Sequence, residues 1–241
     1  MPGNDNDRPR TVRDAMDNAM GEVRNSRRSN RRNVLMILAI VGIVVVARQM
    51  GFLGDSYQGQ PRDTVDVAVL DAGLAALPFV PVLDGNGQGV QVVEFFDYRC
   101  GHCRAMAPIV HDALSAGEPP FALVPIELPI LGPESVLASQ YAMAAALQNG
   151  YGPFHRALMF STVPYTDEGL TDLGAALGLD PVRLAEDAHG DEVAAILNAN
   201  RALAADIGVD GTPSFVIGDL LIVGGIDEAS FIGLIAASEK P

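Results

Sequence analysis

Hydrophobic residues after position 62 follow two rhythms, one typical of strands and one typical of helices. Val90 to Phe96 is a mostly apolar stretch of strand length, and after a short polar break Met106, Val110 and Leu114 recur at helical spacing. The same patterns predict strands at 80–83, 121–126, 214–217 and 220–223, and helices at 64–77, 135–148 and 227–238. A domain of mixed α/β class is therefore expected.

Between residues 126 and 214 the pattern is helical throughout. Besides the alanine-rich segment 135–148, helices are predicted at 151–161, 167–177, 181–188 and 191–207. We therefore expect an α/β domain that spans residues 63–241 and carries a helical insertion at about 133–195.

The most hydrophobic stretch lies near the N-terminus. Val34 to Ala47 contains 14 residues without a charge. A membrane-spanning helix needs about 20 residues, but flanking arginines can reach the interface and residues 49–53 add apolar length. We expect a transmembrane signal anchor at 33–53, followed by a linker at 54–62. A cleaved signal peptide, with small residues at 45–47, and a buried helix are the alternatives.

Charge is distributed unevenly along the chain. Residues 1–48 hold 9 of the 16 basic residues and 5 of the 30 acidic ones, which leaves 7 basic and 25 acidic residues, a net charge of −18, for 49–241. The basic excess keeps the 1–32 tail in the cytoplasm, where we expect it to be disordered, and sends the following domain across the membrane. So acidic a domain repels phosphate, which excludes nucleic acid as its partner.

Both cysteines of the chain, Cys100 and Cys103, lie where the predicted strand 90–96 feeds a helix. A strand that leads into a helix through Cys-x-x-Cys is typical of redox chemistry, since positions three apart share a helix face. The first turn of a helix favours a thiolate. We predict that Cys100 is the exposed nucleophile, that Cys103 is the resolving thiol, and that a protonated His102 further favours the thiolate.

Other interpretations of the cysteine pair remain open at this point. Half of a zinc site is one, although no second Cys-x-x-Cys exists and the other histidines, His111, His155 and His189, are scattered. A static disulfide that closes a small loop is another, and an inert pair on a related fold is a third. We interpret His155 as a helix-surface or packing residue, and Asp97 and Tyr98 as structural caps of the helix that follows.

Three motifs carry a resemblance to a known family. The first, Glu94-Phe-Phe-x-x-x-Cys-x-x-Cys with Pro108, resembles the DsbA-like branch of the thioredoxin superfamily. The second, Gly211-Thr-Pro-Ser-Phe-Val-Ile-Gly218, resembles the cis-proline loop of that superfamily. The third, Leu128-Pro-Ile-Leu-Gly-Pro-Glu-Ser135, is similar to a segment of bacterial DsbA-like thiol oxidoreductases. The third also resembles copper-tolerance thiol oxidoreductases. The chain therefore resembles the DsbA-like branch of the thioredoxin superfamily over roughly residues 63–238.

The resemblance implies a thioredoxin-like fold and names further site residues. It implies that Glu94 exchanges a proton with Cys103, that Pro213 is a cis proline beside the active cysteine, and that Thr212 tunes the redox poise of the pair. In a strand Glu94 points to the face opposite Val93 and Phe95. Burial would raise the pKa of Glu94 toward neutrality, which suits proton transfer.

These observations predict a protein thiol–disulfide oxidoreductase that oxidises exported proteins and needs neither an organic cofactor nor a metal. Its expected partners are thiol-containing exported proteins and a membrane-bound or soluble redox protein that recycles the pair. We expect a single-pass protein of the bacterial inner membrane with its C-terminal domain in the periplasm, or a soluble periplasmic protein if a signal is cleaved. The alternatives are an isomerase or reductase, a Cu(I)-handling protein that uses Cys100, His102 and Cys103, and a membrane-anchored interaction module with an idle fold.

Overall fold

The structure, a computed structural model, describes residues 60–84, 89–117 and 119–238. It contains a six-stranded sheet with strand order β1-β6-β5-β3-β4-β2. The strands span Gln60–Thr64 (β1), Leu83–Asp84 (β2), Val90–Phe96 (β3), Phe121–Glu127 (β4), Ser214–Ile217 (β5) and Leu220–Val223 (β6). The predicted cytoplasmic tail, the predicted anchor at 33–53 and most of the predicted linker lie outside these residues. Within them, the structure has no helix of the length and apolarity that a membrane span requires.

Strand β3 lies inside the sheet and leads to the cysteine pair. It runs parallel to β4 and antiparallel to β5. All but one of its residues are buried, which agrees with its mostly apolar sequence Val-Gln-Val-Val-Glu-Phe-Phe. Strand β2 pairs only with Ala122 and Leu123, so Pro125 lies beyond it, as the missing N–H of a proline predicts.

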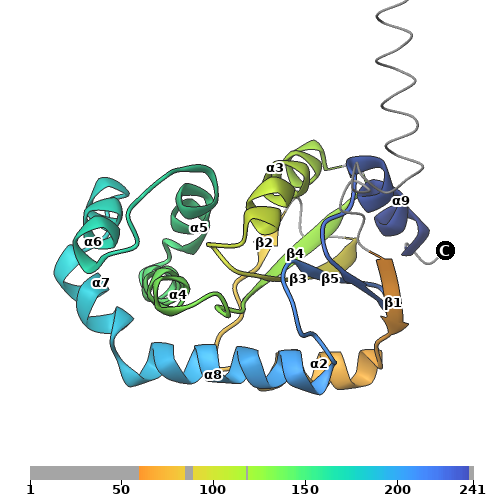
Figure 1. The fold of residues 1–241 in the computed structure, drawn as a ribbon, viewed down its shortest axis with the longest axis horizontal. Helices are drawn as coiled ribbons and strands as arrows, with labels where there is room; N and C mark the ends of the chain where they lie inside the picture. The colour runs from red at the N-terminus through yellow and green to blue at the C-terminus, as the bar shows by residue number, and fades with distance from the viewer. Residues whose placement is uncertain (1–59, 85–88, 118, 239–241) are drawn as a thin grey trace, which may run out of the picture. The chain divides into compact units, whose positions relative to one another are not determined.

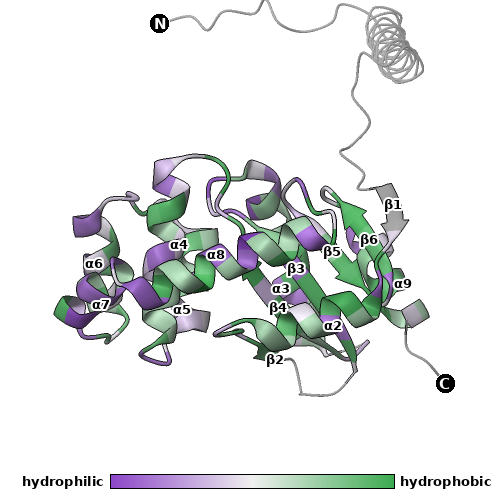
Figure 2. Ribbon diagram, turned by 90° about the horizontal axis from the view of Figure 1, so that it is seen from below, coloured by the Kyte–Doolittle hydropathy of each residue, from purple (hydrophilic) through white to green (hydrophobic). Residues whose placement is uncertain are grey.

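Helices cover both faces of the sheet (Figure 1). Helices α3 (Gly101–Ala116) and α9 (Glu228–Ser238) pack on the face that includes Val92, while α2 (Val67–Ala76) and α8 (Asp191–Asp206) pack on the face that includes Val93. Figure 2, seen from below, shows α2 and α8 lying across strands that are mostly hydrophobic. The predicted α/β class is confirmed, and Glu94 is placed on the α3 side by the alternation of β3.

A helical layer is inserted between β4 and α8. It consists of α4 (Pro133–Ala146), α5 (Tyr151–Phe160), α6 (Asp167–Ala176) and α7 (Pro181–Ala188). Helix α4 contacts α5, α6, α7 and α8, and Figure 1 shows it surrounded by them. Alanines on α4 are almost completely buried, because small side chains let neighbouring helices approach closely. These helices match the predicted segments to within about two residues.

The structure corrects the expected start of the domain. Residues 60–62, which the pattern assigned to a linker, begin β1, which pairs with β6 and lies at the edge of the sheet that the described strands form. Its sequence Gln-Pro-Arg-Asp-Thr carries no apolar signal, so pairing with β6 decides its conformation. The first helix begins at Val67, not at residue 64, because Asp66 caps it by accepting from the N–H of Ala68. The predicted strand at 80–83 was misplaced, because β2 spans only 83–84 and residues 80–82 are not part of a strand.

Candidate active site

Helix α3 begins at the cysteine pair. Cys100 occupies the N-cap position with extended backbone angles, φ −71° and ψ 114°, and its sulfur accepts a hydrogen bond from the N–H of Cys103 at 3.4 Å. The N–H of Cys100 donates to the carbonyl oxygen of Asp97 at 3.0 Å, which closes the turn between β3 and α3. A cysteine sulfur therefore fills the place that Ser, Thr, Asp or Asn usually takes at the start of a helix.

The two sulfurs lie in different environments, and both cysteines are free thiols. Cys100 keeps 6% of its surface exposed, whereas Cys103 is fully buried at 0%. Cys100 is thus the more accessible of the two, as predicted, but much less exposed than that prediction implied. Both cysteines belong to the same hydrophobic cluster as Phe96, Tyr98 and Ala107.

Hydrogen bonding and burial separate the pKa values of the two thiols. The pKa of Cys100 is lowered to about 5, first by a hydrogen bond from the Cys103 thiol and further by the backbone N–H groups of Cys103 and His102 and by Thr212, against burial, which raises it. Burial raises the pKa of Cys103 well above its ordinary value, and its hydrogen bond to Cys100 raises it further. Near neutral pH the pair therefore holds one thiolate, on Cys100, and one thiol.

The loop before β5 faces the reactive sulfur. The Thr212–Pro213 peptide bond is cis, as the sequence predicted, and Cys100 Sγ lies 3.3 Å from the carbonyl oxygen of Thr212. Residues 112 positions apart in the sequence are thus in contact. The hydroxyl of Ser214, the first residue of β5, donates to the carbonyl oxygen of Gly211 at 2.7 Å and so stabilises this loop.

Glu94 lies beneath the pair, on the α3 side of β3. It is 3% exposed, and its strand neighbours are Pro125 of β4 and Phe215 of β5. Burial raises the pKa of Glu94 to about 8, and the charge of Cys100 raises it further in the same direction. Glu94 therefore keeps its proton near neutral pH. Its low exposure and its place in β3 confirm the predicted burial and orientation.

The charged side chains around the pair point away from it. Arg99 forms an exposed salt bridge with Glu134 at 3.0 Å. Arg104 donates to the carbonyl oxygens of Leu158 at 2.6 Å and Ser161 at 2.5 Å, at the C-terminal end of α5. The positive charge of Arg104 thus compensates helix carbonyls. His102 is exposed on the first turn of α3, and its predicted effect on the thiolate stays a prediction.

Asp97 does not cap α3, contrary to the sequence interpretation. Its fully buried carboxylate accepts from the N–H groups of Arg99 at 2.7 Å, Ile130 at 2.9 Å and Leu131 at 3.0 Å, and from the hydroxyl of Ser135 at 2.7 Å. It therefore ties the loop before Cys100 to the loop that follows β4. Cys100 itself caps the helix, so the carboxylate is free to serve the neighbouring loop.

A buried polar cluster behind the loop was missed by the sequence analysis. Glu127 at the end of β4 accepts from the hydroxyls of Tyr98 at 2.8 Å, Tyr151 at 3.1 Å and Ser139 at 2.7 Å, and the Tyr98 hydroxyl lies 3.0 Å from Nδ1 of His155. We call these five residues the Glu127 cluster. His155 is thus a buried packing residue and not a surface one. Burial raises the pKa of Glu127 to about 8 and lowers that of His155 to about 3.

No metal site accompanies the pair within residues 60–84, 89–117 and 119–238. There, no group of three or more His, Cys, Asp and Glu side chains converges as metal ligands would. What the described residues bring together is an accessible sulfur of low pKa, a buried second sulfur one helical turn away and a buried protonated carboxyl group. This arrangement suits thiol–disulfide exchange.

The chain is similar to known proteins over most of the described residues. A family model for the DSBA-like thioredoxin domain matches residues 91–236. A solved thioredoxin-like oxidoreductase from Silicibacter pomeroyi is 38% identical with a TM-score of 0.63, and the match covers 69% of this chain and 95% of that one. The comparison with curated proteins finds no match.

Two further solved structures are similar. The thiol-disulfide exchange protein alpha-DsbA2 from Wolbachia pipientis is 27% identical with a TM-score of 0.64, over 71% of this chain and 92% of that one. A periplasmic thioredoxin-like protein from Salmonella enterica serovar Typhimurium is 25% identical with a TM-score of 0.62, over 73% and 98%. These likenesses confirm the predicted thioredoxin-like α/β fold.

Proposed function

Because the chain belongs to the family of DSBA-like thioredoxin domains and is a thiol–disulfide oxidoreductase, we propose that it oxidises the thiols of exported proteins through Cys100 and Cys103. The observation that carries this proposal is the contrast between the two sulfurs. A thiolate on Cys100, with a pKa lowered to about 5, stabilises the reduced pair. A pair whose reduced form is stabilised draws electrons from its partner and acts as an oxidant.

The exchange starts from the oxidised pair. A substrate thiolate attacks Cys100 Sγ, the bond between Cys100 and Cys103 breaks, and Cys103 leaves with the electron pair. A second substrate thiolate then attacks the substrate sulfur of the mixed disulfide, and Cys100 leaves as a thiolate. The substrate has lost two electrons and gained a disulfide, and the cysteine pair has gained both electrons.

Glu94 supplies a proton to Cys103 in this scheme. Cys103 is fully buried and has a raised pKa, so it leaves best when it is protonated as it departs. Glu94 is buried beneath it with a pKa of about 8 and holds a proton near neutral pH. A donor whose pKa lies near the working pH is suited to this transfer, and the reverse transfer resets the site when the pair is reoxidised.

The loop at Thr212 and Pro213 orients the partner protein in this proposal. Pro213 has no backbone N–H, and the Thr212 carbonyl oxygen lies beside Cys100 Sγ at 3.3 Å. An extended substrate segment that pairs with this loop would bring its own cysteine to Cys100. Thr212 also helps to lower the pKa of Cys100, which makes it a candidate for tuning the redox poise. His102 would favour the thiolate further when its imidazole is protonated.

The proposed place of action is outside the cytoplasm. Disulfide chemistry belongs in oxidising compartments, and the similar Salmonella protein is periplasmic. The positive excess ahead of the apolar run supports an anchor at 33–53 with the domain on the periplasmic side of the inner membrane. The partner that reoxidises Cys100 and Cys103 is then a membrane or periplasmic redox protein.

The test is the redox equilibrium of the protein with glutathione buffers. A potential near about −120 mV is expected for an oxidase, whereas a value near about −270 mV would mean a reductant and would overturn the proposed direction. An intermediate value would favour an isomerase. Cys100→Ser is expected to abolish exchange, and full activity in that variant would remove the mechanism altogether.

A further inference from the structure

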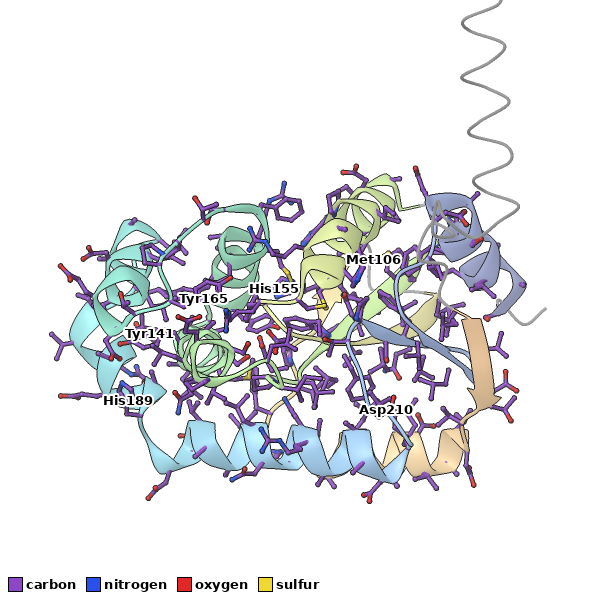
Figure 3. The ribbon with its side chains drawn as sticks, in the orientation of Figure 1. Met106, Tyr141, His155, Tyr165, His189 and Asp210 are labelled. Atoms are coloured by element: carbon purple, nitrogen blue, oxygen red, sulfur yellow. The ribbon has the colours of Figure 1, made fainter. Side chains whose placement is uncertain are left out.

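The Glu127 cluster joins four parts of the fold at one carboxyl group. Tyr98 belongs to the loop before α3, Ser139 to α4, Tyr151 and His155 to α5, and Glu127 to β4. Figure 3 shows His155 at the boundary between the helical layer and α3. The helical layer is therefore bonded to the loop that presents Cys100, although no member of the cluster takes part in the exchange described above.

Burial makes this cluster rigid. Glu127, Tyr98 and Ser139 are fully buried, and His155 and Tyr151 are 2% and 5% exposed. A buried polar atom that loses its partner is costly in free energy, so each hydroxyl stays where the carboxyl oxygens can accept its hydrogen bond. The rings add their own contacts, with Tyr151 stacked on His155 at 5.4 Å and Phe96 edge-on to Tyr98 at 5.2 Å.

Tyr98 connects the Glu127 cluster to the loop that holds the reactive sulfur. It precedes Cys100 by two positions, and its carbonyl oxygen accepts from the hydroxyl of Tyr165 at 3.2 Å. One of the bonds that lower the Cys100 pKa runs from the N–H of Cys103 to Cys100 Sγ, across 3.4 Å. A loop that shifted by a few tenths of an ångström would weaken that bond, because hydrogen bonds fall off steeply with distance and angle.

We propose that Glu127 is a positioning residue for disulfide exchange. It holds Tyr98 in place, and Tyr98 in turn keeps Cys100 Sγ within hydrogen-bonding distance of the N–H of Cys103. The inference rests on the proposed function and deepens it. Loosening the cluster would raise the pKa of Cys100 and make the reduced pair less stable. The helical layer would then help to set the redox poise of the cysteine pair, although no cluster residue contacts the substrate.

The test compares hydroxyl removals at two places in the full-length protein. Tyr98→Phe removes the hydroxyl that bonds Glu127 and His155 and leaves the ring. Tyr141→Phe is the control, since this fully buried tyrosine donates to Asp167 at 2.9 Å in the same helical layer, and Figure 3 shows it farther from α3. Glu127→Leu removes the shared acceptor, and Glu127→Gln restores one acceptor oxygen.

Two readouts separate positioning from stability, namely the equilibrium constant with glutathione and the pH midpoint of Cys100 alkylation. Tyr98→Phe and Glu127→Leu are each expected to shift the equilibrium constant about threefold toward the disulfide form. Each should also raise the pH midpoint of Cys100 alkylation by about half a unit, which is the same change in free energy. Glu127→Gln should recover part of this shift, and Tyr141→Phe should lower the melting temperature alone.

A Tyr98→Phe protein with wild-type equilibrium constant and wild-type midpoint would overturn the inference, whatever its melting temperature. This variant decides the matter even if Glu127→Leu does not fold, because it retains the packing of the ring. Failure of the wild-type pair to equilibrate with glutathione would instead overturn the proposed function. The two failures are therefore distinguishable.

Discussion

The backbone N–H of Cys103 points at the sulfur of Cys100 across 3.4 Å, so the reactive side chain is itself the N-cap of its helix. The same atom therefore meets a structural and a chemical requirement. As an N-cap it satisfies one of the free N–H groups at the helix start, and as a thiolate it gains charge-assisted hydrogen bonding there. Forming the disulfide removes the charge and thereby weakens the cap.

Alkylation of the reduced protein should follow the titration of Cys100 alone. With a pKa lowered to about 5, the rate of reaction with iodoacetamide is expected to be flat above neutral pH and to fall to half near pH 5. Mass spectrometry should find the label on Cys100, because Cys103 is buried and protonated. A midpoint near about 8.5, the value of an unperturbed cysteine, would contradict the site as described.

Thr212→Val should raise that midpoint. Thr212 is among the groups that lower the pKa of Cys100, and valine keeps the shape of threonine without its hydroxyl. The expected direction is upward from about 5, measured by the same alkylation profile. Ser214→Ala is the matched control, since it removes a hydroxyl that bonds Gly211 in the same loop. Equal midpoints in Thr212→Val and wild type would show that this hydroxyl has no influence on the thiolate.

Glu94→Gln should change how stability depends on pH. The folded pKa of Glu94 is raised from 4.5 to about 8, so its contribution is fully present below pH 4.5 and is lost as the pH rises through 8. Glutamine does not titrate. The variant is therefore expected to gain stability over the wild type as the pH rises through this window, measured by urea unfolding of the reduced proteins.

A difference between Glu94→Gln and wild type that stays constant from pH 4.5 to 8 would mean that Glu94 is not buried as described.

The same variant should slow protein oxidation by roughly 10²-fold or more, if Glu94 is the proton donor of Cys103. Glu94→Asp offers a useful comparison, since it keeps a carboxyl group but shortens its reach.

Asp97→Asn should destabilise the protein by roughly 2–4 kcal/mol in urea unfolding. One carboxylate oxygen accepts from the N–H groups of Ile130 and Leu131 and the other from Arg99 and Ser135, and an amide nitrogen accepts from none of them. The control is Asp180→Asn, an exposed N-cap of α7 where asparagine serves equally well, and it should cost less than about 1 kcal/mol. Equal losses at both positions would contradict the role assigned to Asp97.

The elements that lead to the cysteine pair could be predicted because local pattern and tertiary environment agree there. Strand β3 is buried on both faces, so its mostly apolar sequence was visible, and its alternation placed Glu94 opposite Val93. The helices of the insertion were equally visible, since caps such as Thr166 and Asp180 mark where they begin. Short-range signals sufficed for these parts.

The parts that could not be predicted depend on contacts between distant residues. Strand β1 is set by β6, which lies far along the chain, and the carboxylate of Asp97 serves backbone groups 33 and 34 positions away. Tyr98, Glu127 and His155 meet over separations of 29 and 57 residues. The only local hint of the cluster was a glutamate at the end of an apolar strand, a position where burial without a partner would be costly.

The contact between Arg104 and the end of α5 means that the helical insertion cannot be exchanged independently of the core. Arg104 stands immediately after Cys103 and donates to two carbonyl oxygens at the end of α5, so the core contributes the cation and the insertion contributes the acceptors. A chimera with the insertion of a relative would retain these two hydrogen bonds only if α5 of that insertion ended at the same place. If the new insertion ended α5 elsewhere, the guanidinium of Arg104 would be half-buried without its acceptors. The exchange would then perturb the neighbouring Cys103 as well.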